Sequence, residues 1–548
     1  MLERKKVALL SNVTVDLIAG KLRRKYDIYI PEGFDTWVQD AIDPMSVLYT
    51  QGVDAAIVLL DGTEARAWSS IEEGTERISF WKQAIISLVN NIAGPVFLST
   101  IDFRENRIKS LSERKYRYEL ENEWYQFVQK TIDANKNVFL IDLADIIADM
   151  GRKQFYSNKM WYLSSMPYSR DGLSAVSSEI DRVLGSAFSP RKKIIALDLD
   201  NTLWGGIIGE DGVDGIDLAD HKEGQRYYDF QRQLLEMKKR GIVLAINSKN
   251  NPEDAEAAIQ GHPAMLLRDT DFVSRKINWE NKAINLKAME HELNITEGGF
   301  VFIDDNPVER ETVKGECPDV YVPDYPADTS ELLSYAEEIW FDCCRPLRVL
   351  GEDLNKTKMY QDEAKRKQEM SESLNLDDYI AKLGMEVDIH RMRPSEVERV
   401  VQLINKTNQF NVTTKRYTKE QIEGIEKDHK NVIYVVYSAD KYGDSGLISV
   451  IILKTENEYT KIDTFLMSCR VMGRKLEDVI INELAARYKG QLIGEYIPTA
   501  KNAPVNNLFD RLGFTLVSTT EDKKRYVLET DLYVKKSFNM YKTIKYED

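Results

Sequence analysis

Two pairs of carboxylates in this sequence follow directly after apolar runs. Asp198 and Asp200 end the run Ile-Ile-Ala-Leu, and Asp304 and Asp305 end the run Phe-Val-Phe-Ile. Short apolar runs of this kind are typical of buried strands in a parallel sheet, and ligands of such sheets bind beyond the carboxyl ends of the strands. Carboxylate oxygens are the ligands that Mg²⁺ prefers, usually together with a substrate phosphate. The two pairs therefore predict a Mg²⁺ site for phosphoryl chemistry, held by Asp198, Asp304 and Asp305 and by the backbone carbonyl of Asp200.

Two further residues make this interpretation more specific. Ser248 ends a third apolar run, and Lys282 begins a helical pattern. The order of the blocks resembles the haloacid dehalogenase (HAD) superfamily, whose four motifs are matched here in sequence, three of them at strand ends. The matching residues are Asp198 with Asp200, then Ser248, then Lys282, then Asp304 with Asp305.

The resemblance to the HAD superfamily implies a role for each residue. Asp198 would be the nucleophile that forms an aspartyl-phosphate, and Asp200 would be the general acid and base. Ser248 would hold a phosphoryl oxygen, and Lys282 would neutralise the nucleophile and the phosphate. Further candidates for substrate binding are Asn201, Thr202, Lys249 and Asn250.

The segments between the motifs are too short for a separate cap domain. The glycine-rich stretch 205–215 fits a β-flap. The later segment fits one helix over 252–260 and one short strand over 264–267. We therefore expect a nearly uncapped site, which suits macromolecular or carrier-bound substrates better than small free metabolites.

Three longer segments resemble a narrower family, the FkbH-like proteins of HAD subfamily IIIC. They are LDLDNTLWGGIIGEDG at 197–212, VFIDDNPVER at 301–310 and TNQFNVTTKRY at 407–417. The resemblance covers essentially the whole chain and implies a multidomain α/β protein. Its parts would be an SGNH-hydrolase-like, flavodoxin-type domain at 1–188, an uncapped Rossmann-like HAD domain at 189–345, a charged helical connector at 346–380 and an α+β acetyltransferase-like (GNAT) domain at 381–548.

The same resemblance implies a function. Such enzymes dephosphorylate a phosphorylated, glyceryl-type acyl donor and transfer the acyl unit to the phosphopantetheine arm of an acyl carrier protein, in secondary-metabolite or polysaccharide biosynthesis. Two alternatives stay open: a stand-alone phosphatase that acts on a small phosphorylated metabolite, and an inactive scaffold in a biosynthetic cluster. The complete set of HAD motif residues argues against the scaffold.

The first third of the chain alternates between strands and helices, which favours a parallel sheet. Strands are expected over 7–10, 27–30, 55–60, 95–99 and 137–141. Ser11 lies where an SGNH esterase carries its nucleophile, but no histidine precedes His221. A serine nucleophile needs a base, usually histidine. We therefore expect this domain to be non-catalytic, with Ser11 as a turn or cap residue.

The last third resembles a GNAT fold in the order of its elements. Arg470 and Gly473 fit the loop that binds a pyrophosphate at a helix N-terminus, but Lys475 replaces a small residue there. Binding of coenzyme A is therefore in doubt. Cys469 lies beside cationic residues that favour the thiolate, so it could carry an acyl group. The equally weighted alternative is a small buried residue at a strand end.

Composition restricts the class of protein. The net charge of the 548 residues is −15, which argues against nucleic-acid binding. The four cysteines do not form a disulfide framework, no apolar run is long enough to span a membrane, and no signal peptide is recognised, so we expect a cytoplasmic enzyme. An acidic carrier protein would then need a local basic patch, for which 414–417 and 470–475 are the candidates.

Overall fold

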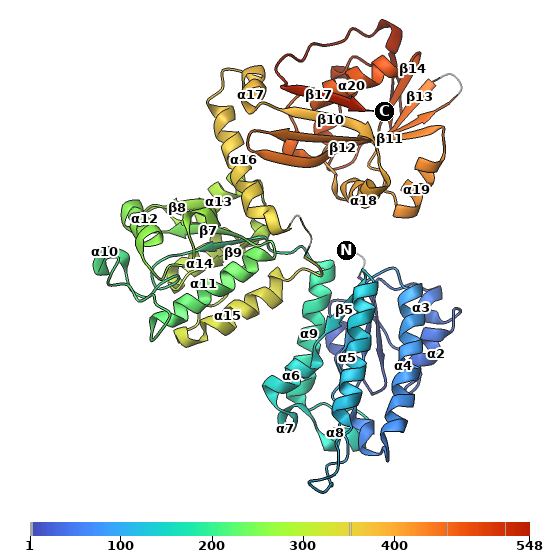
Figure 1. Cartoon of the computed structure of the whole chain (residues 1–548), viewed down its shortest axis with the longest axis vertical. Coiled ribbons are helices and arrows are strands. Elements are labelled where there is room, and N and C mark those ends of the chain that lie inside the picture. Colours follow the sequence, from blue (N-terminus) through green and yellow to red (C-terminus); the bar gives the residue numbers. More distant parts are fainter. Residues whose placement is uncertain (1–3, 350, 352, 457–458, 521, 548) are drawn as a thin grey trace. The chain divides into compact units, whose positions relative to one another are not determined.

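The computed structural model describes residues 4–349, 351, 353–456, 459–520 and 522–547. The chain divides into two compact units, Met1–Thr357 and Lys358–Asp548 (Figure 1). Among the described residues, none of the helices is both long and apolar enough to cross a membrane.

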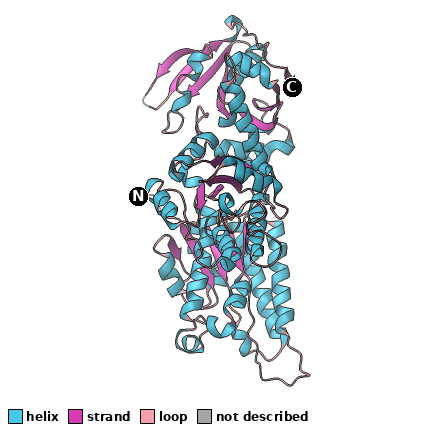
Figure 2. Ribbon diagram, turned by 90° about the vertical axis from the view of Figure 1, so that its left-hand side faces the viewer, coloured by secondary structure: helices cyan, strands magenta, loops and turns pink. Residues whose placement is uncertain are grey.

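The first unit begins with a five-stranded parallel sheet in the order β2-β1-β3-β4-β5. Alternate residues of β1 enter two different cores: Val7 and Leu9 pack with α1 and α9, whereas Ala8 and Leu10 pack with α2, α4 and α5. Both faces are thus covered by helices, as expected for a parallel sheet (Figures 1 and 2). The strands are β1 (Lys6–Ser11), β2 (Asp27–Tyr29), β3 (Ala55–Leu59), β4 (Val96–Ser99) and β5 (Val138–Ile141). The helices are α1 (Asp16–Leu22), α2 (Trp37–Ile42), α3 (Val47–Thr50), α4 (Ile71–Asn91), α5 (Arg117–Ala134), α6 (Leu143–Met150), α7 (Arg152–Phe155), α8 (Asn158–Ser164) and α9 (Arg170–Phe188).

All five strands predicted for this region are present, within two residues at each end. Ser11 ends β1 and its hydroxyl donates a hydrogen bond to the carbonyl of Leu59 at 2.6 Å. That bond connects two neighbouring strands, which is a structural role for this side chain.

The second sheet of the first unit has four parallel strands in the order β8-β7-β6-β9. The strands are β6 (Ile194–Leu197), β7 (Val243–Ser248), β8 (Phe272–Ile277) and β9 (Phe300–Ile303). The helices are α10 (Ile208–Asp211), α11 (Gly224–Lys239), α12 (Pro252–Gly261), α13 (Lys282–Leu293), α14 (Pro307–Glu316) and α15 (Leu332–Ile339). Every residue of β6, β7 and β9 is buried, so the continuous apolar runs of the sequence correspond to strands covered on both faces.

One local prediction for this domain is wrong. The segment 264–267 is not a strand, although Met265 and Leu267 are buried. Its backbone is satisfied instead by the side chain of Gln231, which accepts hydrogen bonds from the amides of Leu266 and Leu267 at 3.0 and 3.2 Å. The predicted flap is closed at its base by the antiparallel pairing of Gly205 with Asp217. Between these residues lies the short helix α10, where the Asp211 carboxylate accepts a hydrogen bond from the Ile207 amide.

The second unit contains an eight-stranded mixed sheet in the order β15-β16-β14-β13-β12-β11-β10-β17. The strands are β10 (Glu386–Arg391), β11 (Asn431–Asp440), β12 (Gly443–Thr455), β13 (Tyr459–Met467), β14 (Gln491–Tyr496), β15 (Thr515–Thr519), β16 (Lys524–Glu529) and β17 (Thr543–Glu547). The helices are α17 (Leu376–Leu383), α18 (Val397–Lys406), α19 (Lys419–Lys427), α20 (Leu476–Arg487) and α21 (Leu508–Arg511).

The parallel strands β13 and β14 of this sheet pair only over their first halves, Tyr459–Ile462 with Gln491–Gly494. Beyond that point Val412 lies between the two strands. The amide of Val412 donates to the carbonyl of Phe465, and the carbonyl of Val412 accepts from the amide of Ile497. The gap between the diverging strands is therefore bridged by residue 412 of the segment 407–417.

The helix α16 (Lys356–Ser371) lies in the predicted connector, of which residues 350 and 352 are outside the described part. The prediction of a fully solvated helix is wrong on one face. Arg366 is buried and forms two hydrogen bonds with Asp440, at 2.7 and 2.9 Å. These partners are far apart in sequence, so the charge pattern of the helix alone did not indicate them.

Two side chains of the segment 407–417 contact one buried carboxylate, that of Asp463. Asp463 accepts hydrogen bonds from Lys415 at 2.6 Å and from Tyr417, and pairs with Lys454 at 3.0 Å. Burial alone would raise the pKa of Asp463, but these partners outweigh it and lower the pKa to about 2. Lys415 is thus engaged inside the unit, and Arg416 donates to the carbonyls of Ile404 and Thr407.

Replacement of Asp463 by asparagine is expected to destabilise the chain by about 2 kcal/mol at pH 7, the scale of a hydrogen bond to a charged group. Because the folded pKa is lowered, the stabilisation is complete above the ordinary carboxyl pKa and is lost as the pH falls toward 2. Urea denaturation should therefore show a difference between wild type and D463N that shrinks below about pH 4. A pH-independent difference would contradict this explanation.

Candidate active site

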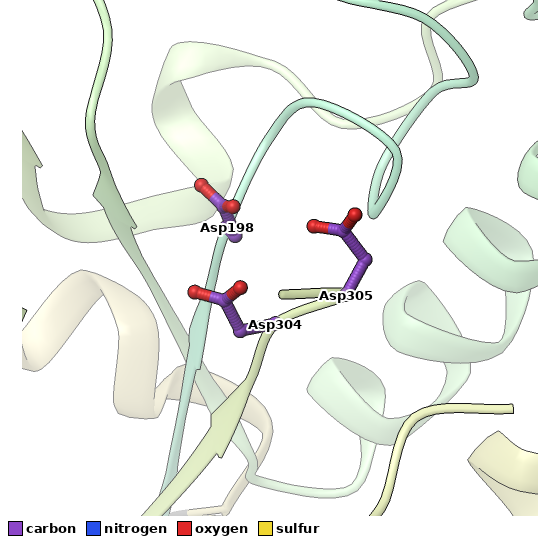
Figure 3. A group of neighbouring side chains, drawn as sticks. All are labelled: Asp198, Asp304 and Asp305. Atoms are coloured by element: carbon purple, nitrogen blue, oxygen red, sulfur yellow. The ribbon is translucent and has the colours of Figure 1, made fainter. Parts of the chain in front are cut away.

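Three carboxylates converge at the carboxyl edge of the four-stranded sheet (Figure 3). Asp198 directly follows β6, and Asp304 and Asp305 directly follow the neighbouring strand β9. One ligand oxygen from each residue lies within 4.8 Å of the others. Asp198 and Asp304 are buried and Asp305 is half-buried. The predicted pairing of the first and fourth motifs is therefore present as one compact group.

Lys282 brings a positive charge into direct contact with this group. It is the first residue of α13, where Asn281 caps the helix through a hydrogen bond from the Ala283 amide. Its ammonium lies 2.8 Å from Asp198 Oδ2 and also donates to Asp304 Oδ2. Burial alone would lower the pKa of Lys282, but the two carboxylates outweigh it and raise the pKa, so this side chain stays cationic.

The charges of the group do not balance. Burial, followed by repulsion from Asp198, raises the pKa of Asp304 to about 6, and the same causes raise the pKa of Asp305. Three carboxylates share one ammonium, so a further cation is favoured at the point where their oxygens converge. Oxygen ligands alone select a hard cation such as Mg²⁺. The residues therefore fit the expected metal.

Three asparagines hold Lys282 from behind, and sequence reasoning missed them. Asn247, on β7 next to Ser248, donates to the carbonyl of Lys282 at 2.9 Å. Asn285 donates to Asn247 and to Asn278, both at 3.0 Å. Asn247 and Asn285 are buried. The sequence shows only three asparagines near the motif residues, and the two that bond each other, Asn247 and Asn285, lie 38 residues apart.

Asp200 is separate from the carboxylate group and is held by its own partners. Its Oδ1 accepts hydrogen bonds from the indole of Trp204 at 2.9 Å and the amide of Ile208 at 3.1 Å. Its Oδ2 accepts from the side chain of Asn250 at 2.9 Å. Burial raises the pKa of Asp200, helped by the negative charge of Asp198. A fixed carboxyl with a raised pKa suits proton transfer, whereas its predicted contribution to the metal site, through the backbone carbonyl, stays a prediction.

The other predicted residues surround this centre. Ser248 is buried at the end of β7. Lys249 forms an ion pair with Glu309 at 2.6 Å. Asn201 has a positive φ of 52° and accepts a hydrogen bond from the Gly206 amide, so it shapes the turn after β6. Thr202 is buried, with a hydroxyl that lacks a partner among the described residues.

The predicted residues of the second unit have a different environment. Cys469 is exposed, whereas Cys317 and Cys344 are buried. Of the cations expected beside it, Arg474 is buried and pairs with Asp440 and Glu363 at 3.6 Å. Lys475 pairs with Asp377 at 2.6 Å. Both charges are thus already compensated within the unit. Arg470 precedes the short loop in which Gly473 has a φ of 77°.

Comparison with solved structures agrees with this site. The chain is similar to the crystal structure of the N-terminal part of protein BF1531 from Bacteroides fragilis, which contains a phosphatase domain complexed with Mg (26% identity, TM-score 0.57). The match covers 63% of this chain and 95% of that chain. The chain is thus a multidomain α/β protein, and part of it is similar to a phosphatase domain that was crystallised with Mg.

Similarity to acetyltransferases is confined to about a quarter of the chain. An acetyltransferase from Thermus thermophilus has 15% identity and a TM-score of 0.21, over 26% of this chain and 96% of that chain. The ribosomal-protein-S18-alanine N-acetyltransferase from Escherichia coli has 13% identity and a TM-score of 0.21, over 27% and 99%. Scores of this size do not decide the function of the second unit. No protein-family model matches the chain, and a search of curated proteins gives no match.

Removal of the Lys282 ammonium should leave two buried carboxylates uncompensated. We expect Lys282→Ala to lower the free energy of unfolding by about 3–5 kcal/mol without added metal. Lys287→Ala is the matched control, because Lys287 is exposed on the same helix. Denaturant titrations of both variants test this, and equal stability of the two would contradict the proposed role of Lys282.

Proposed function

We propose that this chain is a Mg²⁺-dependent phosphatase or phosphotransferase, and specifically an FkbH-like enzyme. It would dephosphorylate a phosphorylated, glyceryl-type acyl donor and pass the acyl unit to an acyl carrier protein. The observation that carries the first part is the convergence of Asp198, Asp304 and Asp305 around Lys282. The second part rests on the sequence resemblance and on the exposed Cys469.

In this proposal each residue of the site takes one step. The Asp198 carboxylate attacks phosphorus, the bond to the leaving group breaks, and Asp200 gives its proton to the departing oxygen. Asp200 then takes a proton from water, which attacks the aspartyl-phosphate and releases phosphate. Lys282 holds Asp198 in place throughout, since it is fixed by Asp304 and by the asparagines behind it. Mg²⁺ bound by the three carboxylates would neutralise the phosphoryl oxygens.

The second unit supports acyl transfer through a thiol better than through coenzyme A. Arg474 and Lys475, which would face a pyrophosphate, are paired with carboxylates instead. Cys469 is exposed. Its thiolate would attack the acyl carbon of a donor activated as an acyl phosphate, breaking the acyl C–O bond and releasing phosphate, while the Asp198 site would remove a second phosphate of the donor that is held as an ester. The thiol of a carrier protein would then take the acyl group and restore the Cys469 thiol. A stand-alone phosphatase is the alternative if this thiol takes no part.

The metal and the nucleophile can be tested on the same protein. Asp198→Asn should abolish phosphate release from acetyl phosphate while the circular dichroism spectrum stays unchanged. Mg²⁺ should raise the thermal midpoint of the wild type. At a Mg²⁺ concentration of a hundred times Kd, the free energy of unfolding should increase by about 2.7 kcal/mol. Asp304→Asn should remove this shift.

Asp324→Asn is the control for both effects, because Asp324 is an exposed carboxylate of the same domain. Full turnover by Asp198→Asn, or an unchanged Mg²⁺ shift in Asp304→Asn, would overturn the phosphatase assignment.

The role of Cys469 separates the two halves of the proposal. Cys469→Ser should release the ester phosphate at the wild-type rate but fail to load a carrier protein, and intact-protein mass spectrometry should find an acyl adduct on the wild type only. Cys343→Ser serves as the control. Normal loading of the carrier by Cys469→Ser would show that the thiol is structural and would leave the phosphatase alone in place.

A further inference from the structure

Trp279 is an exposed aromatic residue held in a fixed place beside the phosphatase site. It is 70% exposed and lies in the loop between β8 and α13, three residues before Lys282. Its indole N–H donates to the side-chain oxygen of Asn251 at 3.2 Å. The loop is fixed on both sides, by the contact of Asn278 with Asn285 and by the cap at Asn281. The indole ring of Trp279 is thus exposed to solvent, and its hydrogen bond to Asn251 fixes its orientation.

Hydrogen bonds connect this ring to the acid and base of the site. Asn251, whose side chain accepts the bond from the indole, donates a hydrogen bond from its backbone amide to the side-chain oxygen of Asn250 at 3.0 Å. Asn250 in turn donates to Asp200 Oδ2 at 2.9 Å. Trp279 therefore belongs to the side of the site on which Asp200 acts, rather than to the side of Asp304 and Asp305.

A second exposed apolar residue adjoins the residue that binds the other oxygen of Asp200. The amide of Ile208 donates to Oδ1, and its neighbour Ile207 is 42% exposed. The helix α10 that follows Ile207 packs against α12, which begins directly after Asn251. Ile207 therefore adjoins one hydrogen-bond partner of Asp200, and Trp279 is linked to the other partner, Asn250, through Asn251.

Charges around this place are already compensated. Lys282 is held by Asp198 and Asp304, and Lys249 by Glu309. Arg310 donates to the carbonyls of Asp304 and Asp305. These cations face the phosphoryl side or are paired, so the leaving-group side offers apolar contact rather than positive charge.

We propose that Trp279 and Ile207 form a leaving-group subsite for an uncharged group with a planar or apolar portion. This inference rests on the proposed phosphatase function and deepens it. The glyceryl-type donor has such a leaving group when it is carried at the end of an extended amide-containing arm, that of the acyl carrier protein. A small or highly charged leaving group gains nothing from these two side chains, because contact with an aromatic ring depends on buried apolar area.

The test compares two phosphate donors that differ in the leaving group. p-Nitrophenyl phosphate releases a planar aromatic group, and acetyl phosphate releases a small one. Trp279→Ala should raise KM for p-nitrophenyl phosphate about tenfold, corresponding to the loss of one aromatic contact, with kcat little changed. KM and kcat for acetyl phosphate should stay the same. Trp279→Phe should restore most of the difference, and Ile284→Ala, an exposed position on α13, is the control.

Failure of the proposed phosphatase function and failure of the subsite give different results in this experiment. If the wild type hydrolyses neither donor in the presence of Mg²⁺, the proposed phosphatase function fails and the subsite fails with it. If the wild type hydrolyses both and Trp279→Ala changes both equally or neither, the phosphatase stands and the subsite is overturned. A loss confined to kcat would assign Trp279 to positioning of the loop before Lys282 and would also overturn the subsite.

Discussion

The carboxylate site depends on one interaction, the contact of the Lys282 ammonium with both Asp198 and Asp304. Two buried carboxylates on neighbouring strands repel each other, and the fold tolerates them because a buried cation lies between them. The pKa of Asp304 remains raised, to about 6, so one ammonium does not complete the compensation. The residual negative charge makes the same place a binding site for a hard cation and, with it, for a phosphate.

The rest of the domain supports this arrangement in layers. Parallel strands β6, β7 and β9 bring their carboxyl ends to one edge, which places Asp198, Ser248 and Asp304 together. Behind them, Asn247 and Asn285 satisfy buried polar groups around the first turn of α13. Beside them, Trp204 and Asn250 fix Asp200. These contacts fix the three side chains to which we assign separate roles: Asp198 for attack, Lys282 for charge compensation and Asp200 for proton transfer.

How far the sequence predicts this site depends on the distance between interacting residues. Asp198 and Asp304 could be placed because each follows a continuous apolar run, and parallel strands align their ends without further information. The asparagines behind Lys282 could not, because Asn247 meets Asn285 only after the chain has folded. The strand predicted at 264–267 failed for the same reason: its apolar residues are buried, but the side chain of Gln231 replaces a neighbouring strand. In the second unit, the motif predicts Arg474 as part of a basic surface patch. In the structure this side chain is buried and pairs with Asp440.

A phosphorylated carboxylate trapped during turnover tests the central claim most directly. The enzyme is mixed with acetyl phosphate and Mg²⁺, quenched in acid within the first turnovers, digested and analysed by peptide mass spectrometry. The account predicts a phosphoryl group on the peptide that contains Asp198, and its absence after replacement of Asp198 by asparagine. A phosphoryl group on another residue, or active turnover with no adduct under conditions that preserve acyl phosphates, would contradict it.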